Sequence, residues 1–185
     1  ISPVDDTAMN RELALGHDGA LAETQKFWAK ELKTRTSIHL SEPLLQGWVD
    51  HFPRLEAMIA EKHPETGDYG LTSGSLVYEA IWATPMAQAA YGLEFTGYGK
   101  EVEKYIETFR RHQGTIEPPS PYLKKHPGYL GSPKTFTSID WMTDHGAILW
   151  AAANHGLLSM NREFLRRWEP AIVKACEFIR DARRA

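Results

Sequence analysis

Apolar residues recur along most of this chain at the spacing of an α-helix. In the clearest segment, which follows Gly99, they occupy positions i, i+3, i+4 and i+7 with charged residues between them, and they are Val102, Tyr105, Ile106 and Phe109. No segment shows the sustained alternation of apolar and polar residues that is typical of a half-buried strand. The sequence therefore predicts an all-α fold with no sheet.

Cap and breaker residues divide this pattern into expected helices. They cover residues from about 20 to 35, 43–59, 76–95, the segment after 99, 139–155, and from about 161 to the end. Because proline removes a backbone donor and crowds the preceding turn, we expect Pro53 to kink or split its helix and Pro170 to interrupt the last one. In that last helix, the residues expected to point inward are Ile172, Ala175, Cys176 and Ile179.

The segment 114–138 lacks the helical pattern and contains five prolines. A loop of this length in a compact domain is usually functional or disordered. Aromatic residues interleave with the prolines, namely Tyr122, Tyr129 and Phe136. These residues favour an ordered loop that packs on the helices.

Composition and charge narrow the class of protein. The 185 residues suffice for one domain with a substantial core. A net charge of -3 without a run of basic residues argues against a nucleic-acid partner, and no apolar stretch reaches the ~20 residues of a membrane span. The single cysteine, Cys176, excludes an internal disulfide. We expect no metal or other cofactor, because the chain has no Cys cluster, no His-x-x-x-His pair on one helix and no glycine-rich phosphate loop.

Two segments of the chain share one plan. Residues 78–113 and 140–180 each begin with a polar and aromatic turn, continue as a helix rich in small residues and end in an amphipathic helix. This order predicts an inner helix followed by an outer helix, stacked pair by pair as in repeat proteins. The starts of the inner helices would then meet at one mouth, with residues 114–138 as one of its walls.

Several runs of the sequence resemble the six-hairpin glycosidase superfamily. They are GALAETQKFW (19–28), VYEAIW (77–82), IDWMTDHGAILW (139–150), REFL (162–165) and PAIVKA (170–175). The resemblance implies an (α/α)6 toroid of helical hairpins that binds, and usually hydrolyses, glycosides in a central cleft. The chain holds about three hairpins, so the resemblance implies half a toroid, completed by the remaining half or by a second copy. Residues 1–18 are then an N-terminal extension, and residues 19–185 a partial toroid truncated at its C-terminus.

One position departs from the pattern of this superfamily. Many members carry an Arg-Asp pair shortly after the tryptophan of the first inner helix, and the matching residues here are Thr84 and Pro85. The departure keeps two alternatives to a hydrolase open. One is a non-catalytic carbohydrate-binding or scaffold protein, and the other is a helical-repeat module that binds proteins.

Carboxylates at the expected mouth are the candidates for catalysis. Hydrolysis of a glycosidic bond needs two carboxyl groups that flank it. Asp140 and Asp144 share one helix face, which places both on the same side of a sugar. A pair from two helices straddles the bond better, so we expect Glu79 and Asp144 to act as general acid and base, with a partner carboxylate in the remaining half of the toroid as the alternative. Asp140 is expected to bind substrate or to cap its helix.

Aromatic and histidine side chains near these carboxylates are candidates for sugar binding. Trp82 and Trp141 offer flat apolar faces with a polar N–H, and Tyr78 belongs to the same turn as Trp82. His145, four residues after Trp141, either faces the same pocket or is a core residue whose hydrogen bonds are satisfied. The remaining tryptophans fit core positions: Trp28, Trp48, Trp150 and Trp168.

Overall fold

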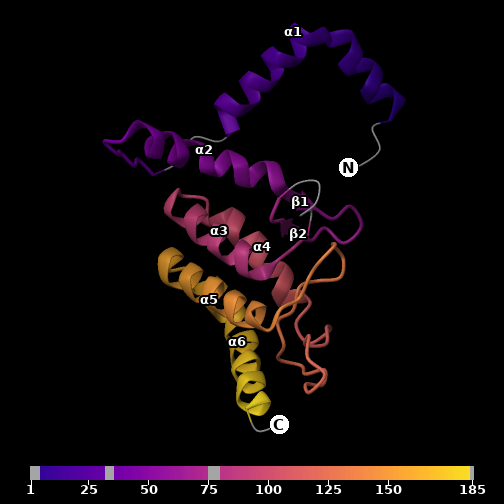
Figure 1. Ribbon diagram of the computed structural model, residues 1–185, viewed down its shortest axis with the longest axis vertical. Coiled ribbons are helices and arrows are strands. Elements are labelled where there is room, and N and C mark those ends of the chain that lie inside the picture. The colour runs from indigo at the N-terminus through magenta and orange to yellow at the C-terminus, as the bar shows by residue number, and fades with distance from the viewer. Residues whose placement is uncertain (1–4, 32–35, 75–79, 184–185) are drawn as a thin grey trace.

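The computed structural model describes residues 5–31, 36–74 and 80–183. Within these ranges the chain forms six helices and one pair of short strands (Figure 1). The elements are, in order, α1 (Asp6–Glu31), α2 (Pro43–Ile59), β1 (Ala60–Lys62), β2 (Tyr69–Leu71), α3 (Ala83–Phe95), α4 (Gly99–Arg111), α5 (Met142–Ser159) and α6 (Arg162–Ala182). The mostly helical character that the periodicity predicts is confirmed.

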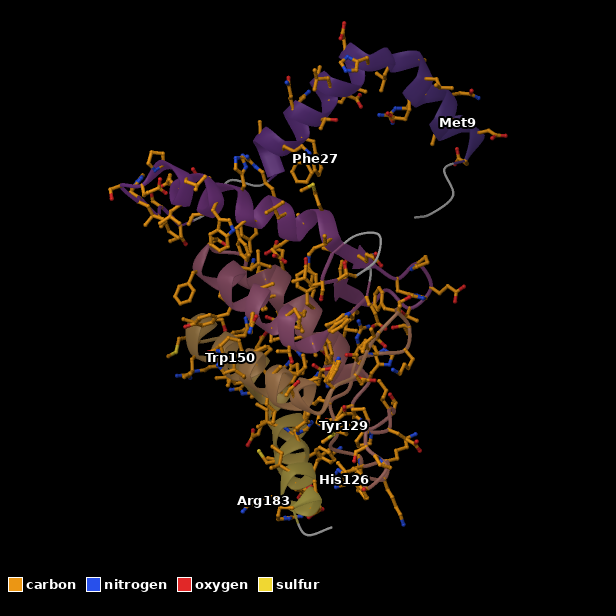
Figure 2. All side chains as sticks on the ribbon, viewed as in Figure 1. Met9, Phe27, His126, Tyr129, Trp150 and Arg183 are labelled. Carbon is orange, nitrogen blue, oxygen red and sulfur yellow. The ribbon has the colours of Figure 1, made fainter. Side chains whose placement is uncertain are left out.

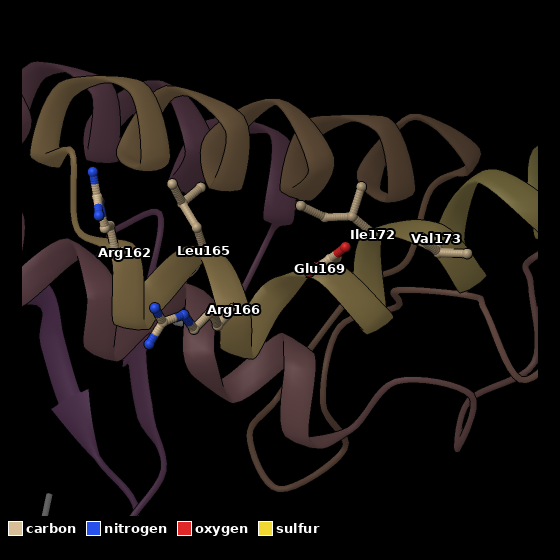
Figure 3. A pocket seen from close by; sticks show the side chains of 6 residues that line it. All are labelled: Arg162, Leu165, Arg166, Glu169, Ile172 and Val173. Carbon is tan, nitrogen blue, oxygen red and sulfur yellow. The ribbon is translucent and has the colours of Figure 1, made fainter.

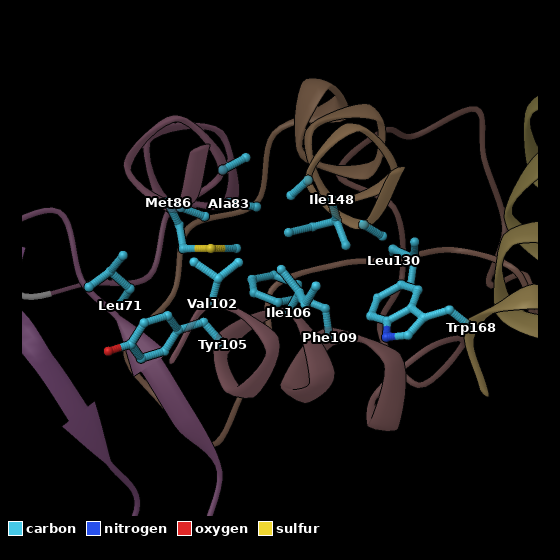
Figure 4. Close-up of a cluster of buried hydrophobic side chains, with 14 of the residues drawn as sticks. Leu71, Ala83, Met86, Val102, Tyr105, Ile106, Phe109, Leu130, Ile148 and Trp168 are labelled. Atoms are coloured by element: carbon cyan, nitrogen blue, oxygen red, sulfur yellow. The ribbon is translucent and has the colours of Figure 1, made fainter. Parts of the chain in front are cut away.

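The core is built around α3 and α5, which pack side by side, while α4 and α6 pack against this pair. The two central helices bury small residues, among them Ala87 and Ala90 of α3 and Ala151 of α5. Short side chains let helix backbones approach closely. Larger residues fill the remaining space, and Figure 4 shows Ile106 of α4 and Trp168 of α6 in this cluster.

A small antiparallel hairpin precedes the helical core. Ala60 of β1 lies opposite Leu71 of β2, and the turn between the strands contains Gly67 with a φ of 69°. The prediction that the chain has no sheet is wrong here, because strands of three residues are too short to show alternation. The hydroxyl of Thr108 in α4 donates to the Tyr69 carbonyl at 2.9 Å and lies 3.1 Å from the Tyr69 N–H. These bonds attach the hairpin to the helices.

Several helix boundaries differ from the predicted ones. α2 continues through Pro53 and α6 through Pro170. Pro53 is buried, so packing offsets the backbone hydrogen bond that the proline removes. α5 runs past Gly156 and ends before Met160, whose φ of 51° is left-handed. α1 contains a non-helical residue, Gly16, and extends across the boundary expected at residue 18.

Residues 112–141 form a long loop that packs against the helices. Tyr129 is fully buried beside α6 (Figure 2) and Phe136 packs on the core, as predicted, whereas the prediction is wrong for Tyr122, which is 87% exposed. The Gln113 side-chain amide donates to the carbonyl oxygens of Gly128 in the loop and Ala171 in α6. The loop backbone also touches α6 directly, since a Cβ added at Gly128 would lie 1.8 Å from the carbonyl oxygen of Lys174.

The contact at Gly128 gives a test of this docking. Gly128→Ala forces a methyl group into the backbone of α6, and we expect it to lower the free energy of unfolding by about 2–3 kcal/mol in urea titrations. Gly146→Ala in α5 is the matched control, because a Cβ there meets nothing within 4 Å. Better helix propensity should raise the stability of this control by up to about 1 kcal/mol. Equal stability of the two variants would contradict the docked loop.

A buried polar cluster joins the four core helices. His155 of α5 is 2% exposed, with Nδ1 against the Glu94 carboxylate of α3 and Nε2 3.3 Å from Glu103 Oε2 of α4. Arg167 of α6 pairs with Glu103 and lies 3.3 Å from Glu107. Burial alone would lower the pKa of His155, but the hydrogen bonds and charges of Glu94 and Glu103 outweigh burial and raise this pKa.

This raised pKa makes part of the stability depend on pH. A histidine with a higher pKa in the folded than in the unfolded chain stabilises the fold while it is protonated. That stabilisation is fully present below the unfolded value of about 6.5 and is lost as the pH rises through the folded value. The native protein should therefore exceed His155→Gln in unfolding free energy by more at about pH 5.5 than at about pH 9. His39→Gln, at an exposed site, is the control, and a native-minus-His155→Gln difference independent of pH would refute the role of the cluster.

Candidate functional site

The starts of α3 and α5 lie next to each other. Ile81 and Ser138 form an isolated parallel bridge, in which the Ile81 N–H donates to the Thr137 carbonyl at 2.9 Å and the Ile139 N–H to the Ile81 carbonyl at 3.3 Å. The bridge aligns the two segments that lead into the helices. We call residues 81–84 and 138–144 the mouth. Both helix N-termini carry partial positive charge there, which favours a carboxylate between them.

Asp144 ties the two halves of the mouth together. It is 1% exposed, and its Oδ1 accepts hydrogen bonds from the backbone N–H and the hydroxyl of Thr84, at 3.2 and 2.9 Å. Its Oδ2 accepts the N–H of Trp141 at 2.7 Å. Burial raises the pKa of Asp144 and the nearby charge of Asp140 adds to this, while the three hydrogen bonds oppose it, and the net shift is upward.

Asp140 holds the long loop at the edge of the mouth. Its Oδ1 accepts the Ser132 N–H at 2.6 Å, and its Oδ2 pairs with the Lys134 ammonium group at 2.7 Å. The Asp140 side chain is 7% exposed, whereas that of Lys134 is 60% exposed. Trp141 occupies the N-cap position of α5, so Asp140 does not cap this helix. Asp140 instead binds the backbone and a cation of the loop.

Two tryptophans form an aromatic pair at the mouth. Trp82 precedes α3 and Trp141 precedes α5, each at the N-cap position. Their ring centroids are 6.4 Å apart with an angle of 28° between the planes. Trp141 is 56% exposed, so more than half of its surface is accessible to solvent next to Asp144, which accepts its backbone N–H. The structure thus brings together Trp82, Asp140, Trp141 and Asp144, as the repeat predicts.

His145 lies in the core and not on the mouth. It is 3% exposed, its Nδ1 accepts the Leu130 N–H at 3.0 Å, and its Nε2 donates to the Ala175 carbonyl at 3.1 Å. Its ring also stacks on that of Tyr129. Burial lowers the pKa of His145. The structure therefore gives His145 the core environment that the sequence left as one of two alternatives, and the expected contact with substrate has no support from its position.

Two predicted site residues, Tyr78 and Glu79, lie outside the described residues. The pair formed by Glu79 and Asp144 therefore stays a prediction. Three residues that the sequence did not single out as functional act on the mouth: Thr84 within it, and Lys134 and Tyr129 beside it. Threonine near a helix start is a capping signal, which applies to Thr84. Lys134 and Tyr129 carry no comparable signal in the sequence, because the path of the irregular loop determines which residues they contact.

Tyr129 is buried behind the mouth. Burial raises the pKa of its hydroxyl, and the charges of Asp140 and Asp144 raise it further. The Tyr129 ring is 0% exposed and contacts both His145 and Phe178. Tyr129 is therefore part of a packed aromatic cluster with His145 and Phe178, close enough to the two carboxylates for their charges to act on its hydroxyl.

Among the residues that the structure describes, no group of three or more His, Cys, Asp or Glu side chains is suited to hold a metal ion. The helices in the same ranges all fall short of the length and apolarity that crossing a bilayer requires. In comparisons with known proteins, the chain matches no protein-family model, no curated protein and no solved structure.

The bonds of Asp144 predict a large effect on stability. Asp144→Ala removes the acceptor of the part-buried N–H groups of Trp141 and Thr84 and of the Thr84 hydroxyl, and we expect a loss of about 2 kcal/mol in unfolding free energy. Thr143→Val is the control, because Thr143 is exposed and its hydroxyl lies 3.3 Å from that of Thr84. The control should change stability by less than about 0.5 kcal/mol. Similar midpoints for the two variants in urea unfolding would show that Asp144 does not hold the mouth.

Proposed function

We propose that the mouth binds carbohydrate and that the chain is a glycoside hydrolase-like domain built on part of an (α/α)6 toroid. The packing of α3 beside α5, with α4 against both and α6 against α5, supports this frame, because stacked helical hairpins place inner helices side by side with outer helices against them. The parallel bridge at Ile81 and Ser138 supports a common mouth for the inner helices.

The observation that supports the proposal is a tryptophan pair, in which Trp141 is exposed and Trp82 half-buried, next to two carboxylates. A pyranose ring presents apolar C–H faces, and an open indole face such as that of Trp141 can stack on them. The hydroxyls of a sugar need polar partners, and Thr143, Asp140 and Lys134 stand at the same edge. The mouth therefore combines the apolar and polar groups that sugar recognition uses.

Asp144 is proposed as one carboxyl of the hydrolytic pair. A general acid that works near neutral pH needs a pKa above the usual range, and burial moves the pKa of Asp144 in this direction. Glu79, three residues before Trp82, is proposed as the second carboxyl. The pair would protonate the leaving oxygen and activate water or attack the sugar, depending on the distance between the two carboxyls.

A non-catalytic carbohydrate-binding module is the second candidate. Both oxygens of Asp144 already accept hydrogen bonds from Thr84 and Trp141, which is the state of a carboxylate that maintains structure. The departure from the Arg-Asp pair of the superfamily also favours this alternative. Thr84, which stands at one of these two positions, donates hydrogen bonds to Asp144. On this alternative the mouth binds sugar and leaves the glycosidic bond intact.

Trp141→Ala tests sugar binding. We expect the affinity for oligosaccharides that bind the native protein, measured by calorimetry across a panel, to fall by about 10-fold or more. Phe27→Ala, on α1, removes an exposed aromatic ring away from the mouth and should leave the affinity unchanged. Absence of binding to the whole panel by the native protein would overturn the proposal.

A measurement of turnover distinguishes a hydrolase from a non-catalytic carbohydrate-binding module. If the chain is a hydrolase, the native protein releases reducing ends from a sugar that it binds, and Glu79→Gln abolishes release while binding is retained. Glu65→Gln, in the exposed turn of the β1–β2 hairpin, is the matched control for loss of a glutamate. Binding without release by the native protein would assign the non-catalytic module.

A further inference from the structure

Two hydroxyl groups behind the mouth are buried without a partner in the protein. They belong to Tyr129 and Ser132 of the long loop, and both residues are 0% exposed. Among the described residues, none lies within hydrogen-bond distance of either hydroxyl. A buried hydroxyl gives up its hydrogen bonds to bulk water, so in folded proteins it almost always has a protein group or an ordered water as its partner. The two hydroxyls therefore indicate a partner other than the protein chain.

Both hydroxyls lie close to the carboxylates of the mouth. The Ser132 N–H donates to Asp140 Oδ1 at 2.6 Å, and the hydroxyl of a serine is never far from its own backbone nitrogen. For Tyr129, the charges of Asp140 and Asp144 both raise the pKa of the hydroxyl, which requires that both carboxylates are near it. Two O–H donors and two carboxylates therefore converge on one small region behind the mouth.

The two carboxylates keep unused acceptor sites in this region. An ionised carboxylate has about four lone-pair sites for hydrogen bonds. Asp144 accepts three hydrogen bonds, all from the segments that begin α3 and α5. Asp140 accepts two, from the backbone and the ammonium group of the loop. Each carboxylate can therefore accept at least one further donor.

We propose that an ordered water molecule binds behind the mouth and joins the two hydroxyls to the two carboxylates. The hydrogen bonds balance. The two lone pairs of the water accept the O–H groups of Tyr129 and Ser132, and its two O–H groups donate to Asp140 and Asp144. A buried water normally makes about three hydrogen bonds, with a range of about two to four, so these partners suffice to hold it.

The burial and the chemistry of the site select water over other ligands. Because Tyr129 and Ser132 are 0% exposed and Asp144 is 1% exposed, a molecule as large as a sugar does not reach between them. The carboxylates repel an anion, and the Lys134 ammonium group already pairs with Asp140 as a cation would. Water both donates and accepts, as a site with two donors and two acceptors requires.

The site differs from the exposed apolar faces of α2, α5 and α6. A groove of about 430 Å³ on the α6 face (Figure 3) is lined by three apolar and three charged residues: Leu165, Ile172, Val173, Arg162, Arg166 and Glu169. An ordered water needs two to four polar partners around one position. The groove is open to solvent and mostly apolar, whereas the region behind the mouth is closed and polar.

The water gives Tyr129 the role of a positioning residue. Through the water, the phenol O–H stabilises the ionised form of Asp140 and Asp144 and fixes the two side chains relative to each other. Burial and the two charges raise the pKa of the Tyr129 hydroxyl, so it keeps its proton and remains a donor at neutral pH. Any effect on hydrolysis rests on the proposed function. The water site itself is independent of whether the mouth binds sugar.

Urea unfolding of two variants that each lose one hydroxyl tests the proposal. Tyr129→Phe and Ser132→Ala keep the rest of the side chain, and Tyr122→Phe, at an 87% exposed position of the same loop, is the matched control. Each of the two variants loses a satisfied hydrogen bond, so we expect its unfolding equilibrium constant to rise about five-fold, and that of the control to change by less than about two-fold. A constant that is unchanged or lower in both variants overturns the proposal, because removal of a hydroxyl without a partner does not destabilise the fold.

A high-resolution crystal structure of the native protein tests the site directly. We expect one water within hydrogen-bond distance of both hydroxyls and of a carboxylate oxygen. A direct hydrogen bond from either hydroxyl to a carboxylate, or a site without water, overturns the proposal. Neither this measurement nor urea unfolding requires a sugar, so their outcome is separate from that of the proposed function.

NMR titration of the aspartate carboxyl groups tests the positioning role of Tyr129. In Tyr129→Phe the ionised carboxylates lose a donor that reaches them through the water, so we expect the pKa of Asp140, of Asp144 or of both to rise by about 0.5 or more. Tyr122→Phe should leave both pKa values unchanged. Equal values in Tyr129→Phe and the native protein would show that the hydroxyl does not act on the mouth.

Discussion

The close packing of α3 on α5 is the constraint on which the rest of the structure depends. Alanines at the contact, such as Ala87 and Ala151, bring the two backbones near each other. Because the helices start side by side, the segments before them pair through Ile81 and Ser138. Both tryptophans of the mouth then stand at equivalent positions, just before the first residue of each helix. A larger residue at the contact would separate the helices and the tryptophans together.

Asp144 converts this packing into a defined site. Its bonds link residues sixty positions apart in the chain, and they use the N–H groups that a helix start leaves free. His145, the next residue, faces the other way and fixes the loop backbone and α6 through its two ring nitrogens. Two neighbouring residues of one helix thus hold the mouth in front and its wall behind. Such support is what a binding site needs to keep its geometry without ligand.

Local patterns in the sequence predicted the parts of the fold that depend on local physics. The period of Val102, Ile106 and Phe109 gave the helix α4, and the Ala-rich run before His155 gave α5. Hydrogen bonds such as that between Thr84 and Asp144 could not be predicted from the sequence, because they follow from how the helices pack. The predicted breaks at Pro53 and Pro170 are absent for a related reason. Pro53 lies in a helix that tertiary contacts stabilise, and a local rule does not include those contacts.

The exposed faces follow from the same sequence property that built the mouth. α5 carries apolar residues on both of its sides: Ala151 is buried, whereas Trp150 and Leu157 are exposed. The prediction of inward positions is therefore wrong for four residues that are exposed, namely Trp48, Trp150, Cys176 and Ile179. The open faces run along the flanks of α2, α5 and α6, whereas the mouth lies at the N-terminal ends of α3 and α5. The exposed flanks are therefore a different surface from the mouth that contains Trp141.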